Sequence, residues 1–212
     1  AFAGVTAKLR PHVSLPLIAT NRINMPDVAE RILASGAADM VSMARPLLAD
    51  PQLPNKLADG RAGQVVACIS CNQACLDKVF DGKRASCLVN PRAAHETELV
   101  LTPVIERRIR KVAVVGAGPA GLACATVAAD RGHAVTLFDA AAEIGGQFNL
   151  ARRIPGKEEF DETLRYFRQR LGETGVDVRL STPVAASDLA GFDAVVLATG
   201  VVPRAVDFPG CD

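Results

Sequence analysis

The sequence predicts an α/β protein in which two parts with parallel strands flank a cysteine-rich segment. Strand-like and helix-like segments alternate in residues 1–61 and again from residue 111 onward, which is the pattern of parallel sheets with crossover helices. A glycine-rich turn, GAGPAG at residues 116–121, lies between a β-branched run and a helical pattern. Four of the chain's six cysteines fall between Cys68 and Cys87, in a stretch with little periodicity.

In the first part, two short runs, LPLIATN at Leu15–Asn21 and ADMVSMA at Ala38–Ala44, are typical of buried strands. A helix is predicted between them, because Pro26 suits a first helical turn and Gly36 suits a helix end. Short connections between these three elements imply a parallel strand pair. Residues 45–60 predict a loop and a broken helix. Two units of this kind are too few to close a sheet.

In the last part, strands are predicted at Lys111–Val115 and Ala134–Asp139, with a helix at Leu122–Arg131 between them. GVDVRLSTPV and FDAVVLATG predict two further strands. Residues 156–175 predict an amphipathic helix. We interpret its apolar stripe as core packing, and the stripe consists of Phe160, Leu164, Phe167 and Leu171.

The glycine-rich turn fits G-x-G-x-x-G in the strand–turn–helix context that dinucleotide binding requires. Gly116 permits the tight turn, Gly118 lets a pyrophosphate approach the backbone, and Gly121 lets helix and strand pack closely. The helix N-terminus offers N–H groups to the phosphates. Asp139, at the end of the second strand, is placed to accept hydrogen bonds from a ribose. The alternative is an ordinary glycine-rich turn without a ligand.

FAD is favoured over NAD(P) as the dinucleotide, because the chain resembles the FAD half of flavoproteins with two dinucleotide-binding domains. The resemblance rests on Gly145 and Gly146 after the second strand and on VVLATG at Val195–Gly200. We expect further FAD contacts from the glycine-rich turn and from later positions. These are Ala117, Pro119, Ala120, Gln147, Arg153, Val184, Thr199 and Gly200.

The cysteine spacing is Cys68-x2-Cys71-x3-Cys75-x11-Cys87. Disulfides are disfavoured, because a flavin-type Rossmann chain without a secretory signal is expected in a reducing compartment, here the cytoplasm. Zinc usually takes two C-x2-C pairs, and the second pair is broken here. Three clustered cysteines and a distant fourth favour a [4Fe–4S] cluster. Ser70 and Asn72 would tune its potential.

The other two cysteines have no role in this site. Cys124 is expected to be a small buried apolar residue, and Cys211 has no assigned role. Acidic and basic residues nearly balance, with a net charge of +1, so neither a nucleic-acid nor a membrane surface is expected. Because the chain begins without Met and ends just after a strand-like run, we expect a piece of a longer polypeptide.

Three stretches together resemble the NADH:flavin oxidoreductase family, to which trimethylamine dehydrogenase is related, and within it the 2,4-dienoyl-CoA reductase branch. They are NRIN…ADMVSMARPLLADP, CISCNQACLDKVFDGKRASCLVNPRA, and GAGPAGLA…VTLFDAAAEIGGQFN…IPGKEEFDETLRYFRQ. The resemblance implies three domains. Residues 1–61 would be the last βα units of an FMN-binding TIM barrel, 62–110 the iron–sulfur segment and linker, and 111–212 a partial Rossmann-like FAD-binding domain.

The resemblance also implies a function. Arg22, Ala44 and Arg45 match FMN-contact positions, with Arg45 as a charge partner for the phosphate; barrel-end salt bridges are the alternative for both arginines. Electrons would pass from NADPH, bound outside this chain, to FAD, to the cluster, to FMN and to a dienoyl-CoA substrate in unsaturated fatty acid β-oxidation. No catalytic acid is assigned, because the family's proton donors lie outside these residues. Another ene-reductase, an amine dehydrogenase or an inactive cofactor-free fragment are the alternatives.

Overall fold

The structure is a computed structural model, and it describes residues 2–202, 204 and 207. The chain forms two compact units. The first contains Ala1–Thr102 and Ala151–Arg170, and the second contains Pro103–Leu150 and Leu171–Asp212. The predicted domain limits at residues 61 and 110 stay a prediction.

The first unit begins with two short parallel strands, β1 (Ile18–Thr20) and β2 (Met40–Ser42), in which Ile18 pairs with Met40. Both lie within the predicted strand segments. The helical elements of this unit up to residue 80 are α1 (Ala3–Leu9), η1 (Arg10–His12), α2 (Pro26–Ala34), α3 (Arg45–Ala49), α4 (Leu53–Ala58), η2 (Ala62–Gln64), η3 (Gln73–Asp77) and α5 (Lys78–Phe80). The predicted parallel pair and the helix between its strands are therefore confirmed.

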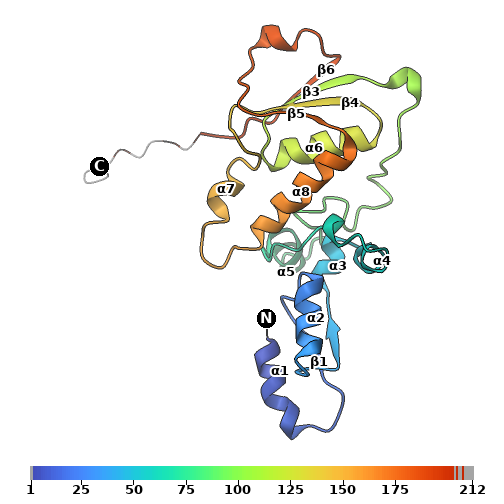
Figure 1. Cartoon of the computed structure of the whole chain (residues 1–212), viewed down its shortest axis with the longest axis vertical. Helices are drawn as coiled ribbons and strands as arrows, with labels where there is room; N and C mark the ends of the chain where they lie inside the picture. Colours follow the sequence, from blue (N-terminus) through green and yellow to red (C-terminus); the bar gives the residue numbers. More distant parts are fainter. Residues whose placement is uncertain (1, 203, 205–206, 208–212) are drawn as a thin grey trace. The chain divides into compact units, whose positions relative to one another are not determined.

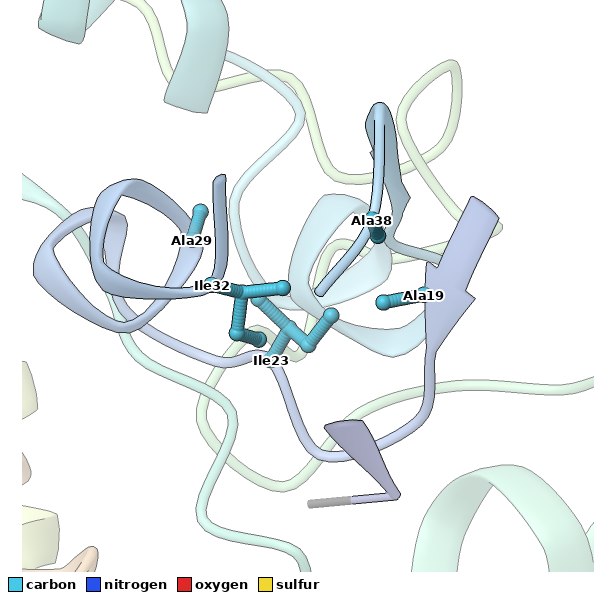
Figure 2. Packing of buried hydrophobic residues seen from close by; sticks show 5 residues of the cluster. All are labelled: Ala19, Ile23, Ala29, Ile32 and Ala38. Carbon is cyan, nitrogen blue, oxygen red and sulfur yellow. The ribbon is translucent and has the colours of Figure 1, made fainter. Parts of the chain in front are cut away.

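A small apolar cluster joins α2 to the strands. It consists of Ala19, Ile23, Ala29, Ile32 and Ala38, each at most 7 % exposed. Figure 2 shows Ile23 and Ile32 pointing toward one another between the helix and the strand that carries Ala19. Small alanines at the remaining positions let the helix lie close to the strand. This packing fixes the loop after β1, on which the predicted site residue Arg22 lies.

A buried carboxylate organises the chain just before the cysteine segment. Asp50 is 3 % exposed and accepts hydrogen bonds from Lys56 Nζ (2.6 Å) and the Val66 N–H (2.9 Å). Lys56 also donates to the Gln64 carbonyl at 2.9 Å. Burying a charge is costly unless it is paired and fully hydrogen-bonded. The pair therefore ties helix α4 to the residues that lead into Cys68.

The second unit contains a four-stranded parallel sheet with the order β5-β4-β3-β6 (Figure 1). The strands are β3 (Lys111–Val115), β4 (Ala134–Phe138), β5 (Asp177–Arg179) and β6 (Ala194–Leu197). All four fall where strands were predicted. The other elements after residue 102 are η4 (Glu106–Arg108), α6 (Pro119–Asp130), α7 (Phe148–Ala151), α8 (Phe160–Thr174) and η5 (Ala186–Leu189). Of these, α7 ends in the first unit and α8 begins there.

The core of the second unit is built from residues of α6 and of the two central strands. Ala113 and Val114 on β3, Leu137 on β4, and Leu122 and Ala125 on α6 are fully buried. The helix begins at Pro119, three residues before its predicted start, because proline is accepted at the first helical position.

Cys124 was expected to be buried but is only partly buried, because α6 is apolar on nearly all sides and the sheet covers only one of them. No helix in the described part of the chain is long and apolar enough to cross a membrane.

Candidate functional site

The glycine-rich turn connects β3 to α6 by close backbone contacts. Gly116 has φ +110°, and a Cβ added there would lie 2.2 Å from the Ala198 carbonyl oxygen. A Cβ on Gly121 would lie 1.8 Å from the Gly116 carbonyl oxygen. Neither position accepts a side chain. Gly118 is different, since it precedes α6 as its N-cap and a Cβ there would meet nothing within 4 Å. The open space above Gly118 is what a pyrophosphate needs.

Asp139 holds this turn in place. Its carboxylate accepts hydrogen bonds from the Ala117 N–H at 2.5 Å and from the Ala141 N–H at 2.7 Å. The sequence predicted a ribose contact for Asp139, which stays a prediction. The hydrogen bond between Asp139 and the turn was not predicted. The position of Asp139 directly after β4, the strand next to β3, was the feature of the sequence that could have indicated it.

The glycine pair after β4 lies directly against the turn. Gly145 donates its N–H to the Ala117 carbonyl at 2.8 Å. Gly146 has φ +51°, and a Cβ on it would lie 3.2 Å from the Gly118 Cα. The structure thus brings two separate glycine motifs to one surface. Gln147 follows them and donates from Nε2 to the Val201 carbonyl at 2.9 Å.

The remaining predicted FAD contacts have varied surroundings. Pro119 and Ala120 form the first turn of α6. Thr199 and Gly200 are exposed after β6, and Val184 is partly buried in the loop before η5. Arg153 is exposed and belongs to the first unit. Their roles toward a ligand stay predictions.

In the first unit, all four clustered cysteines line one cavity. Cys68 is buried, and the other three, Cys71, Cys75 and Cys87, are partly buried. The distant fourth cysteine returns to the others because the Ser86 N–H donates to the Ala74 carbonyl at 2.8 Å. The sequence spacing alone did not show how this return is made.

The backbone around these cysteines is irregular. Ser70 and Asn72 flank Cys71 with φ +53° and +59°. Asn72 is the N-cap residue of the π-helical segment η3, and this segment contains Cys75. Short π-helical segments occur often at functional sites. These turns are what place thiols of unequal spacing around one cavity.

Burial raises the pKa of the Cys68 thiol, although a hydrogen bond from the Ser70 N–H and the charge of Arg45 act in the opposite direction. Burial likewise raises the pKa of the Cys87 thiol. Among the residues that the structure describes, no group of three or more His, Cys, Asp or Glu side chains is arranged to hold a metal ion. The donor set of four thiols fits a [4Fe–4S] cluster by chemistry, and the cluster itself stays a prediction.

A second pocket, of about 350 Å³, lies next to the cysteine cavity and shares Arg45 and Asn72 with it. Arg45 donates to the Asn72 Oδ1 at 2.5 Å and to the Asn21 Oδ1 at 2.9 Å. These bonds fix the guanidinium at the start of α3. The pocket is lined by Asn21, Arg22, Arg45, Ser70, Asn72, Leu76 and Gly156. Two arginines in a pocket of this size suit an anionic small molecule.

Arg22 is engaged by an acid that the sequence analysis missed. Its guanidinium donates to both carboxylate oxygens of Glu159, at 2.6 and 2.8 Å. This hydrogen bond raises the pKa of Arg22. The salt-bridge alternative for Arg22 therefore describes the structure, and its role toward FMN stays a prediction. Ala44 is exposed at the N-cap of α3. The KEEF sequence at residues 157–160 was the only signal for Glu159, and it gave no partner.

Two family profiles match parts of the chain. Residues 2–64 match the NADH:flavin oxidoreductase / NADH oxidase family, and residues 114–174 match an NAD(P)-binding Rossmann-like domain. A metal reductase of Desulforamulus reducens is 43% identical over 215 aligned residues, which cover 99% of this chain and 32% of that protein.

Two solved structures are similar over nearly the whole chain. A 2-naphthoyl-CoA reductase in complex with 2-naphthoyl-CoA has a TM-score of 0.90 at 35% identity, covering 97% of this chain and 32% of that one. A histamine dehydrogenase from Rhizobium sp. 4-9 has a TM-score of 0.85 at 32% identity, covering 97% and 30%. The chain thus spans about a third of the length of these relatives. The matches thus show similarity to the NADH:flavin oxidoreductase / NADH oxidase family in residues 2–64 and to an NAD(P)-binding Rossmann-like domain in residues 114–174.

Proposed function

We propose that this chain, as a segment of an enzyme of the NADH:flavin oxidoreductase family, is its electron-transfer centre. In this proposal Cys68, Cys71, Cys75 and Cys87 hold a [4Fe–4S] cluster. The turn at residues 116–121 holds the pyrophosphate of FAD, and the pocket with Arg45 holds the phosphate of FMN. When bound, the cluster supplies one-electron transfer and the flavins supply transfer of one or two electrons.

The observation that carries the proposal is that four thiols separated by up to 11 intervening residues line one cavity. A [4Fe–4S] cluster is commonly held by four thiolates, and its potential depends on nearby hydrogen bonds and charges. Arg45, which lies in the wall of the cavity, and the Ser70 N–H supply both.

The dinucleotide part of the proposal is supported by the backbone. The Gly118 position is open, Gly146 approaches it closely, and α6 begins there with its free N–H groups. Phosphates bind favourably at such a helix N-terminus. The match to an NAD(P)-binding profile supports a dinucleotide, and FAD is the one that we propose.

For the substrate, we propose a carbon–carbon double bond conjugated to a CoA thioester, with 2,4-dienoyl-CoA as the first compound to test. Support comes from the structural likeness to a 2-naphthoyl-CoA reductase that was solved in complex with 2-naphthoyl-CoA. Oxidation of an amine is the second candidate, because a histamine dehydrogenase is almost as similar. Both would use the same electron-transfer centre.

The test is purification of the complete protein without oxygen, followed by analysis of iron, acid-labile sulfide and released flavins. We expect four irons and four sulfides per chain, together with FAD and FMN. Cys71→Ser should lose the cluster absorbance and keep FAD. Cys124→Ser is the matched control, since this cysteine lies outside the cavity, and it should keep both. One zinc per chain without sulfide would overturn the proposal.

Activity with NADPH then separates the two candidate substrates. Consumption of NADPH with a dienoyl-CoA supports the reductase, whereas reduction of an artificial electron acceptor by an amine supports the dehydrogenase. Neither activity in a preparation that contains cluster and flavins would contradict both substrate proposals.

A further inference from the structure

The second pocket, which is lined by Arg22 and Arg45 among others, is called the arginine pocket below. Four of the residues that line it have left-handed backbone conformations. They are Asn21, Arg22, Ser70 and Asn72, with φ between +51° and +72°. Asparagine tolerates this region, but arginine and serine adopt it only when their surroundings impose it. Such strain collects at functional sites and is offset by specific contacts. The contacts that hold Arg22 and Ser70 are therefore of interest.

Both residues are bound to the same carboxylate. Glu159 Oε1 accepts from Arg22 Nη2 at 2.6 Å and from Ser70 Oγ at 3.3 Å, and Oε2 accepts from Arg22 Nη2 at 2.8 Å. Ser70 also accepts a hydrogen bond from the buried Asn24 amide at 2.8 Å. Its hydroxyl thus has one donor and one acceptor partner, which fixes its orientation.

Glu159 is itself held against the cysteine segment. It immediately precedes α8, and Arg165 on that helix donates to the carbonyls of Gly63 and Val65 at 2.5 and 2.9 Å. These carbonyls lie a few residues before Cys68. The carboxylate therefore has a defined position relative to the loop that it contacts.

We propose that Glu159 is a positioning residue that holds the Ser70 turn between Cys68 and Cys71 and the Arg22 turn at the pocket in their strained conformations. One carboxylate in this way sets the backbone of the cysteine loop, whose Ser70 N–H bonds to the Cys68 sulfur, and the backbone of the anion pocket. The effect on the cluster rests on the proposed function, whereas the effect on the loop does not.

The test is hydrogen–deuterium exchange of the complete protein, with Glu159→Gln compared with the unmodified protein. A lost charge-assisted hydrogen bond corresponds to about a tenfold change or more in a local opening equilibrium. Amides at residues 69–72 and 21–23 should exchange faster by that factor. Asp161→Asn is the matched control, since it removes a nearby carboxylate that lies in the first turn of α8 and contacts Arg152 instead. It should leave both segments unchanged.

Two further variants separate the contact of Glu159 with Ser70 from its contact with Arg22. Ser70→Ala should speed exchange at residues 69–72 and leave residues 21–23 unchanged. In the double variant Glu159→Gln with Ser70→Ala, the increase in exchange at residues 69–72 should be smaller than the sum of the two single effects, because both changes remove the contact between Glu159 and Ser70. Ser70→Ala also removes the hydrogen bond from Asn24, so the double variant should still exchange somewhat faster than Glu159→Gln alone. Unchanged exchange in Glu159→Gln, or additive effects in the double variant, would overturn the proposal.

The cluster supplies an independent readout. In samples matched for iron content, the electron paramagnetic resonance spectrum and midpoint potential of the reduced cluster should shift in Glu159→Gln and not in Asp161→Asn. A purely structural role would lower the iron content without changing the signal of the remaining cluster, and that result would contradict the proposal. If the unmodified protein holds no iron, the proposed function fails, while the exchange experiment still decides the role of Glu159.

Discussion

The glycine-rich turn of the second unit and the cysteine cavity of the first are built in different ways. The turn is made of backbone, since Gly116 and Gly121 leave no room for a Cβ and Asp139 binds an N–H group. The cavity is made of side chains on irregular loops, which are held by ion pairs and by residues distant in sequence. The first kind of site depends on the absence of side chains, whereas the second depends on their partners.

Substitution of the turn glycines should show the largest effect. Gly121→Val places a side chain on the Gly116 carbonyl, where a Cβ alone would be 1.8 Å away, so we expect the second unit to lose its folded structure. Gly118→Val meets open space within the chain and should fold, yet lose bound FAD. Circular dichroism and flavin content measure the two effects. FAD retained in Gly118→Val would contradict the phosphate-binding role of the turn.

The first unit should be most sensitive at its buried charge. Asp50→Asn leaves Lys56 without its partner, and breaking a buried pair costs about 3–5 kcal/mol. Asp59→Asn is the control, because the Asp59–Arg61 pair is exposed and such pairs contribute about 0–1 kcal/mol. Urea unfolding of both variants gives the free energies. Similar values for the two would mean that Asp50 does not organise the segment before Cys68.

A smaller effect is expected where a side chain supports the backbone turn. Asp139→Asn weakens two hydrogen bonds to N–H groups, which are worth about 1.5–3 kcal/mol each when the acceptor is charged. FAD affinity should fall by roughly tenfold or more, while the cluster absorbance stays the same. Fluorescence titration of the deflavinated protein measures the affinity. An unchanged affinity would show that the glycines hold the turn without help.

The smallest effect concerns an exposed ion pair beyond the cysteines. A hydrogen bond from Arg84, and then one from His95, lower the pKa of Glu98 to about 2. Because the folded pKa lies below the usual value of 4.5, the stabilisation is complete above that value and is lost as the pH falls toward 2. The melting temperatures of the unmodified protein and Glu98→Gln should therefore converge below pH 4.5.

Glu30→Gln is the control for this prediction, because Glu30 is exposed on α2. Its melting temperature should stay close to that of the unmodified protein at every pH. A difference for Glu98→Gln that does not depend on pH would rule out the ion pair as its cause.

The sequence alone determined the regular elements and the dinucleotide turn. Periodicity and β-branched runs located the strands, and β3 has the predicted bounds Lys111–Val115. Helix α6 was also predicted, although it begins at Pro119, three residues before its predicted start. The existence and order of these elements follow from backbone geometry over a few residues, so neighbouring residues suffice to predict them.

Only the tertiary structure decided how the first unit's site is assembled. No local pattern indicated that Glu159 would bind Arg22 across 137 positions, or that Arg45 would lie in the walls of both pockets. Such contacts depend on which distant loops come together in the folded unit. The residues next to each partner in the sequence do not predict which loops these are. A local pattern fixes a turn, but a site built from distant side chains is set only when the whole unit has packed.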